Sequence, residues 1–492
     1  PPPPPPPPLF FLMIRRPARS TLDRSAAASD VYKRQGFGAT PGEMDRYMGM
    51  DYSEVVDELL NVSGTSTMPD DVIFRMFPEY HASLGVDACA NWAYRMVSTD
   101  SPLEEKIALF WHGIFATGND KLNNPLVLLN QIDTFRRNGM GKFDDILLDL
   151  SRDPAMLIWL DNQTNHKDSI NENYGREILE LFSMGVGNYT EEDIKECARA
   201  FTGWSVKNAE YMALMGQKDS IWPYSRISWH YEYRQDDHDY SEKTFLGETG
   251  KFDGADIIEI ICRQESTARF ISRHLYNFFV EDEVQVPSWQ EVPPKNPEAI
   301  STLMDAYFEH RHDLNKVLKV LFESDFFKES EYKKVKGPAE MVINVLRLSG
   351  GFEEPSLSMI QAVDEAGFMG QLLFYPPSVE GWHTGQEWIT SGSVLDRVNF
   401  SSARLTDLSS PGIRDIVNRV RDRCGTDTRP DYVIQVFLEL LGIIEVSDMT
   451  SDLLLEVCGG ENSVIDTTIG SFDVMASNLL RVIGSSKEFH LV

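Results

Sequence analysis

NENYGREILELFSMGVGNYTEEDIKECARAFTGW, residues 171–204, is the stretch that best indicates the fold of this chain. Its first half places four apolar side chains on one side at the i, i+4, i+7, i+8 spacing of an amphipathic helix: Tyr174, Ile178, Leu181 and Phe182. Gly185 then provides a helix stop, and Thr190 with Asp193 predicts the N-cap of a second helix. Because Ile194, Cys197, Ala198 and Phe201 repeat the apolar spacing, we expect two helices that share one core.

The same helical periodicity continues through most of the chain from Gly36 onward. It predicts helices over 41–60, 69–97, 101–116, 124–138, 142–151, 172–184, 191–202, 253–264, 266–280, 298–310, 313–323, 338–350 and 356–373. The last ninety residues are also expected to be helical. Within them RVIGSSKEF (481–489) resembles KVLFESDFF (319–327). Either an internal duplication or a shared way of ending a helix explains this similarity.

A short segment with a period of two interrupts the helical pattern. Ile227, Trp229, Tyr231 and Tyr233 alternate with polar residues, which predicts a strand. Residues 243–247 could pair with it across the loop QDDHDYSE. The chain is therefore predicted to be mainly α, a multi-helical globular protein with one small β-hairpin near 227–247.

A chain of 492 residues is long enough to divide into two or three subdomains. We expect an N-terminal helical subdomain over 36–204, an aromatic hairpin with a His-Asp loop over 205–252, a central helical subdomain containing a Pro/Gly/Trp loop over 253–400, and a C-terminal helical segment over 401–492. Residues 1–35 open on eight prolines and lack periodicity, and they resemble translated sequencing-adapter DNA from the ends of metagenomic fragments. A degenerate export signal is the alternative, although its arginines follow the apolar run instead of preceding it.

Charge and cysteine content exclude several classes of function. The net charge of −30 argues against nucleic acid or an anionic membrane surface as a partner. No apolar run approaches the ~20 residues of a membrane span. The five cysteines form no CxxC pair, which argues against a zinc knuckle or a dense disulfide framework, and Cys197 is predicted to be a small buried thiol.

Part of the opening stretch is not explained by helix packing alone. Asn171, Glu172 and Asn173 lie at the start of the first helix, and Glu177 lies at the edge of the apolar stripe. A carboxylate at this edge is partly buried and needs an arginine, a histidine or a metal ion as partner. The alternative is that these polar groups, together with Arg176, only form hydrogen bonds and ion pairs within the helical scaffold.

Seven motifs resemble, in the same order, a bacterial family known as domain of unknown function 1800: EKIALFWHGIFAT, RDPAMLIWLDN, the opening stretch, HDYSEKTFLG, STARFISRHLYNFF, KGPAEMVINVLR and GQLLFYPPSVEGW. The resemblance covers about residues 36–492. It implies a large, mainly helical protein that is usually exported and has no established activity. Such proteins are often encoded beside an exported protein similar to alkaline phosphatases and sulfatases, which suggests a partner. The chain departs from the family pattern at His383, where proline is more common.

Four further residues carry candidate chemistry. His112 follows Phe110 and Trp111 on an apolar helix, so it is either a catalytic residue or a hydrogen-bonded core histidine. His238 and Asp239 in a polar loop suit a divalent metal ion, although acidic turns are common. Trp382 lies in the irregular stretch FYPPSVEGWHTGQEW, where it either lines a sugar or peptide groove or fastens the loop to the core.

Two hypotheses about function follow. The first is a non-catalytic exported or envelope protein that has a binding or scaffold role with an exported partner. The second is a metal-assisted or acid-base hydrolase, whose site would gather His112, Glu177, Arg176, His238 and Asp239. The second hypothesis requires His112, Glu177 and His238 to lie in one cleft.

Overall fold

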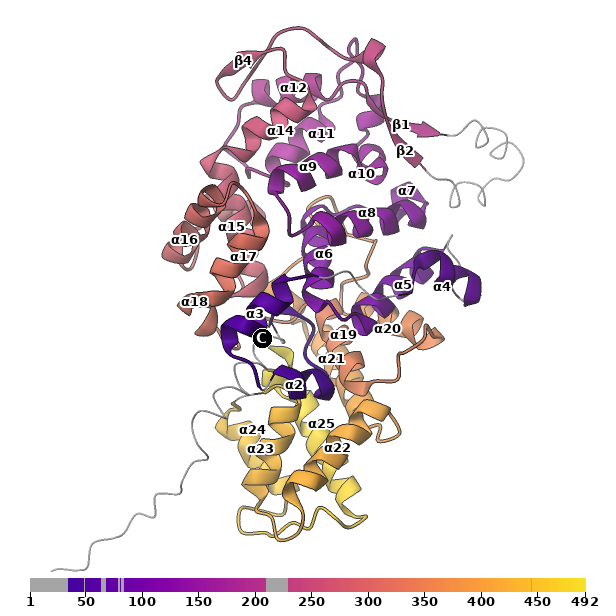
Figure 1. Ribbon diagram of the computed structural model, residues 1–492, viewed down its shortest axis with the longest axis vertical. Coiled ribbons are helices and arrows are strands. Elements are labelled where there is room, and N and C mark those ends of the chain that lie inside the picture. Colours follow the sequence, from indigo (N-terminus) through magenta and orange to yellow (C-terminus); the bar gives the residue numbers. More distant parts are fainter. Residues whose placement is uncertain are drawn as a thin grey trace, which may run out of the picture.

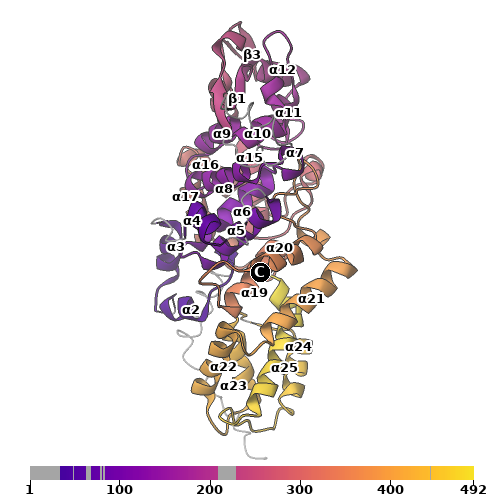
Figure 2. The ribbon, with the colours of Figure 1, turned by 90° about the vertical axis from the view of Figure 1, so that its right-hand side faces the viewer.

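The computed structural model describes residues 34–47, 49–62, 68–77, 80, 84–208, 229–443 and 445–492. This part of the chain is mainly helical and elongated, with the strands near one end and the last helices at the other (Figures 1 and 2), so the predicted fold class is confirmed. Within these residues no helix is both long enough and apolar enough to cross a membrane. Arg34 and Gln35, which the sequence assigned to a non-native segment, are buried.

The helices of the first half are α2 (Pro41–Tyr47), α3 (Tyr52–Leu60), α4 (Asp70–Met76), α5 (Gly85–Ser98), α6 (Pro102–Ile114), α7 (Asn119–Leu122), α8 (Pro125–Asn138), α9 (Phe143–Arg152), α10 (Pro154–Trp159), α11 (Asn173–Glu180) and α12 (Glu191–Ala200). Several of them match the predicted ranges, whereas α7 and α10 were not predicted. The predicted helices 41–60 and 69–97 were wrong as continuous elements, because each is two helices. In the first, the Glu54 carboxylate accepts the backbone N–H of Asp51 at 2.9 Å and so begins α3 anew.

The second half adds longer helices and short 3-10 turns. They are α14 (Gly254–Cys262), α15 (Glu265–Phe279), α16 (Pro297–Glu309), α17 (Leu314–Glu323), α18 (Asp325–Lys328), α19 (Pro338–Ser349), α20 (Leu357–Phe368), α21 (Ser391–Leu405), α22 (Pro411–Cys424), α23 (Pro430–Leu440), α24 (Asp448–Val457), α25 (Phe472–Ser485) and α26 (Lys487–His490). The 3-10 turns are η1 (Asn162–Thr164), η3 (Gln235–Asp237), η4 (Val286–Gln290) and η5 (Gly385–Trp388).

The opening stretch forms the two packed helices that its sequence predicts, α11 and α12. The Thr190 hydroxyl accepts the backbone N–H of Asp193 at 3.2 Å, and the Asp193 carboxylate accepts the backbone N–H of Thr190 at 2.9 Å. Gly175 allows close contact between the helices, since an added Cβ would lie 2.9 Å from the carbonyl oxygen of Ile194. Cys197 is fully buried, as predicted.

Two small antiparallel sheets replace the single predicted hairpin. β2 (Trp229–Tyr233) confirms the predicted strand, but it pairs with β1 (Trp204–Asn208), and β3 (Lys243–Phe245) pairs with β4 (Glu248–Gly250). The predicted pairing of 227–234 with 243–247 was therefore wrong; residues 227 and 228 lie outside the described residues. The tight turn at Leu246 and Gly247, both with positive φ, closes β3 onto β4.

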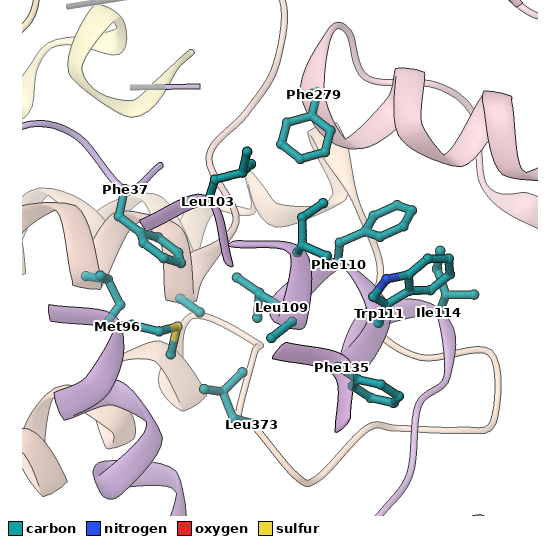
Figure 3. Packing of buried hydrophobic residues seen from close by; sticks show 14 of the residues in the cluster. Phe37, Met96, Leu103, Leu109, Phe110, Trp111, Ile114, Phe135, Phe279 and Leu373 are labelled. Carbon is teal, nitrogen blue, oxygen red and sulfur yellow. The ribbon is translucent and has the colours of Figure 1, made fainter. Parts of the chain in front are cut away.

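Helix α6 runs through the middle of the main core. Figure 3 shows its residues Phe110, Trp111 and Ile114 among side chains from other helices, including Phe135 and Phe279. The Trp111 ring stacks on Phe115 with centroids 4.8 Å apart, and Phe110 meets Phe278 edge to face at 5.2 Å. These contacts fix α6 as a rigid wall for the site described next.

The chain end returns from the helices α22–α25 to the middle of the molecule, where Figure 1 marks it. The backbone N–H of Lys334 donates to the carbonyl oxygen of Val492 at 3.1 Å, and the N–H of Val492 donates back at 2.8 Å. Leu491 thereby packs against Val335. The C-terminal residues thus lie directly behind the candidate site.

Candidate functional site

The irregular stretch 374–388, here called the tryptophan loop, folds over a cavity of about 300 Å³. Aromatic side chains from three separate segments line it: Phe110 of α6, Phe278 of α15, and Trp382 and Trp388 of the loop. Concave sites of this size with aromatic walls and a few polar groups are typical of small-molecule binding. We call this space the tryptophan-loop cavity.

The two tryptophans belong to an apolar cluster of their own. Trp382 and Trp388 are 8 % and 7 % exposed and pack with Val335 and Leu491, apart from the main hydrophobic core. The Gln285 side-chain amide donates to the carbonyl oxygen of Thr384 at 3.2 Å, which ties the loop to the segment after α15. The loop is therefore held in place from two sides.

Gly381 sets the position of Trp382 against α6. Its φ is +85°, which favours glycine, and an added Cβ would clash with the backbone carbonyl oxygen of Gly113.

We expect Gly381→Ala to lower the free energy of unfolding by ~1–3 kcal/mol, because it combines backbone strain with that clash. Chemical denaturation measures this; a change at Gly381 no larger than that of Gly392→Ala, at an open helical site, would contradict it.

His112 supports the loop from the core side. It is fully buried, and its Nε2 accepts the backbone N–H of Phe374 at 3.1 Å. The ring lies 5.0 Å from that of Trp382 and 5.2 Å from that of Trp92. Burial lowers the pKa of His112 to about 3, so the ring stays neutral at physiological pH.

Carboxylates outnumber cations on the polar wall of the cavity. Asp282, Glu340, Glu380 and Glu387 line it, against a single lysine, Lys334. His383, also at the wall, lies 2.7 Å from Glu387. Among the described residues Glu380 has no ion-pair partner, so the loop carries an uncompensated negative charge at the cavity.

Glu340 forms the base of this wall between two buried lysines. It accepts from Lys334 at 2.7 Å and pairs with Lys106, which is 2 % exposed. Burial opposes its ionisation, but the two ammonium groups hold the pKa of Glu340 well below its usual range. Burial lowers the pKa of Lys106 to about 8, against the opposing effect of Glu340. Glu340 is thus committed to these lysines and offers no free carboxylate to the cavity.

Asp282 and His274 complete the polar lining. The Asp282 carboxylate accepts the backbone N–H of Val335 at 2.9 Å, and burial raises its pKa against the effect of Lys334. The Nε2 atom of His274 is buried and has no hydrogen-bond partner in the described structure, and burial lowers the pKa of this histidine to about 3. Its ring is held between Phe270 and Trp289, with centroids 4.4 and 4.6 Å away.

The asparagines of the opening stretch hold local backbone. The Asn171 side chain donates to Thr164 at 3.0 Å and accepts the backbone N–H of Asn173. The Asn173 side chain donates to the carbonyl oxygen of Leu160 at 3.0 Å. Both residues therefore connect the start of α11 to the turn before it, and a binding role for them stays a prediction.

The charged residues of the same stretch divide into two groups. Arg176 forms two hydrogen bonds with Glu191, at 2.8 and 3.1 Å, and lies 4.0 Å from Glu172. Burial raises the pKa of Glu177 to about 7; the charges of Glu180 and Glu380 add to the effect, and Arg176 opposes it. Glu177 is half-buried on α11 and is not among the residues that line the cavity.

The proposed metal pair is already engaged with protein groups. The Nδ1 atom of His238 lies 2.9 Å from the carbonyl oxygen of Thr202, and Asp239 forms an ion pair with Arg199 at 2.8 Å. Burial opposes ionisation, but Arg199 and Ser241 hold the pKa of Asp239 below its usual range. In the part of the chain that the structure describes, no group of three or more His, Cys, Asp or Glu side chains could hold a metal ion.

The three residues that the hydrolase hypothesis requires in one cleft have separate surroundings. His112 packs under the tryptophan loop, Glu177 is half-buried on α11, and His238 packs between Tyr233 and Tyr240 beside Thr202. Sequence reasoning identified Trp382 but missed Asp282, His274 and Glu340. The latter two lie inside the motifs STARFISRHLYNFF and KGPAEMVINVLR, which gave the only signal available.

Comparison with known proteins supports the sequence resemblance. A family model described as "Protein of unknown function (DUF1800)" matches residues 30–491, nearly the whole chain. No curated protein and no solved structure matches it. The match begins a few residues before Arg34, the first described residue, and extends through the tryptophan loop to the C-terminal helices. The chain therefore belongs to the DUF1800 family.

Proposed function

We propose that this protein is a binding protein whose tryptophan-loop cavity takes a small organic ammonium ligand. The observation that carries this proposal is the combination of aromatic walls, Trp382, Trp388 and Phe278, with the uncompensated carboxylate of Glu380. A cation over an aromatic face gains ~0.5–2 kcal/mol, more when water is excluded. A neutral or anionic ligand would gain nothing from this charge.

The overall charge favours the same class of ligand. A net charge of −30 attracts cations to the surface and repels anions. The cavity of about 300 Å³ is large enough for a quaternary ammonium group with a short apolar substituent. The ammonium group of Lys334 pairs with Glu340, which reduces its repulsion of a cationic ligand.

Titration calorimetry with benzyltrimethylammonium tests the proposal on the full chain. We expect Trp382→Ala to weaken binding roughly tenfold or more, because it removes an aromatic wall. Glu380→Gln should weaken it several-fold through the loss of charge. Glu259→Gln, on the exposed face of α14, is the matched control and should leave the affinity unchanged.

Either of two results would contradict this assignment. One is a wild-type protein that does not bind the probe. The other is binding that neither Trp382→Ala nor Glu380→Gln weakens, provided that circular dichroism shows both variants folded.

We further propose that the protein acts outside the cytoplasm, together with an exported protein similar to alkaline phosphatases and sulfatases. The support is the family resemblance alone, which implies export and such a neighbour. Co-expression of the two proteins followed by size-exclusion chromatography tests the partnership. Separate elution at micromolar concentration would argue against a stable complex.

A further inference from the structure

A second concave surface lies away from the tryptophan-loop cavity, along the side of the molecule where α5, α8, α10 and β2 follow one another in Figure 1. It is an open groove of about 980 Å³. Five carboxylates and four arginines line it: Asp70, Glu104, Asp133, Asp149, Asp153, Arg95, Arg136, Arg137 and Arg152. Trp229 and Tyr231 of β2 form its aromatic part.

Most charged groups of the groove are fixed by contacts within the protein. Arg95 pairs with Asp70, with Nε 2.9 Å from the carboxylate. The Asn138 side chain donates to Asp149 at 2.6 Å. Asp153 accepts from the Gln131 side chain at 2.8 Å. A strongly charged ligand would have to break such pairs, whereas a neutral ligand can use their remaining hydrogen-bonding capacity.

Glu104 is the exception. It is 7 % exposed, and its Oε2 atom is buried without a hydrogen-bond partner among the described residues. The adjacent Glu105 accepts the Arg136 guanidinium at 2.6 and 3.2 Å. Arg136 also pairs with Asp133, so its donors are occupied elsewhere. Glu104 therefore lines the groove with one carboxyl oxygen buried and unpaired behind its wall.

Trp229 supplies a second group of the same kind. Its ring lines the groove, and its indole Nε1 is buried without a partner in the described structure. Buried donors and acceptors are nearly always paired in folded proteins, so two such atoms at one groove indicate that something else pairs with them. Hydroxyl groups both donate and accept, which suits an orphan carboxyl oxygen and an orphan N–H together.

We propose that this groove binds a neutral oligosaccharide. The near balance of five carboxylates and four arginines disfavours a charged ligand, and the aromatic rings of Trp229 and Tyr231 offer flat faces to sugar rings. A peptide is the less favoured ligand, because its side chains need apolar pockets and half of the residues that line the groove are charged. This site is independent of the ammonium cavity.

Nuclear magnetic resonance titration of the full chain with cellopentaose and chitopentaose tests the proposal. The indole Nε1–H signal of Trp229 is expected to shift with at least one of these probes. Trp229→Ala should weaken the affinity roughly tenfold or more, and Glu104→Leu should do the same. Glu104→Gln keeps an oxygen that accepts hydrogen bonds, so it should stay within about threefold of wild type. Glu380→Gln, at the other site, should have no effect.

Two outcomes would overturn the inference. If neither pentasaccharide shifts the Trp229 signal at millimolar concentration, the groove is no oligosaccharide site. If penta-alanine shifts it and the sugars do not, the ligand is a peptide. The Trp229 signal is read from the wild-type protein, so a variant that fails to fold does not obscure either outcome.

Discussion

Glu340→Ala is expected to lower the free energy of unfolding by about 3–5 kcal/mol. Glu340 is 5 % exposed and pairs with Lys106 and Lys334, which are 2 % and 6 % exposed. Its carboxylate also accepts the backbone N–H of Gly337 at 2.6 Å, at the start of α19. Removing it would leave two buried ammonium groups without a counter-charge, which costs far more than the lost contacts alone.

Urea denaturation at neutral pH measures this effect. Glu387→Ala is the matched control, because Glu387 is about half exposed and its His383 partner lies at the surface. Exposed ion pairs contribute ~0–1 kcal/mol, so the control should differ little from wild type. A loss below ~1 kcal/mol for Glu340→Ala would mean that water or another anion already compensates the lysines.

Glu104→Gln is expected to raise stability at pH 8, by up to about 3 kcal/mol. Burial, with the charge of Glu105, raises the pKa of Glu104 from its ordinary 4.5 to about 7. The folded state therefore disfavours the ionised carboxyl, and the wild type loses stability as the pH rises from about 4.5 to about 7. Glutamine has no charge to bury. The stability of the variant relative to wild type should therefore increase between about pH 4.5 and about pH 7 and stay constant above that range.

Denaturation of wild type and variant at pH 4 and pH 8 checks the sign. The two proteins should be similar at pH 4, where Glu104 is protonated in both states, and should differ at pH 8. Glu105→Gln provides the contrast. Glu105 forms an ion pair with Arg136, so removing its charge should lower the stability of the folded protein at pH 8. A Glu104→Gln variant less stable than wild type at pH 8 would show that an unseen partner holds the carboxylate.

Local signals made much of the fold predictable. The positions of α11 and α12 were predictable because their signals act within a few residues. These signals are the Thr190–Asp193 pair, the glycine at 185 and the apolar spacing of the two helices. The similar segments 319–327 and 481–489 are a comparable case. Each ends a long helix at a serine, Ser324 or Ser486, with nearly the same backbone angles, and a short helix follows.

Non-local contacts explain what the sequence did not predict. The pairing of β1 with β2 joins Trp204, at the end of the opening stretch, to Tyr233 across more than twenty residues, and no local pattern specifies it. The tryptophan-loop cavity likewise combines Phe110, Asp282, Glu340 and Trp382 from distant parts of the chain. A buried glutamate such as Glu340 resembles any first-turn helix acid until its lysine partners are located.

The central claim is that the tryptophan-loop cavity selects a positively charged ligand. Choline and its neutral isostere 3,3-dimethyl-1-butanol have nearly the same shape and differ in charge, so titration calorimetry of both against the full chain isolates that property. We expect choline to bind at least roughly tenfold more tightly, and this preference to disappear in Trp382→Ala. Equal affinity for the two probes, or tighter binding of the alcohol, would contradict the account.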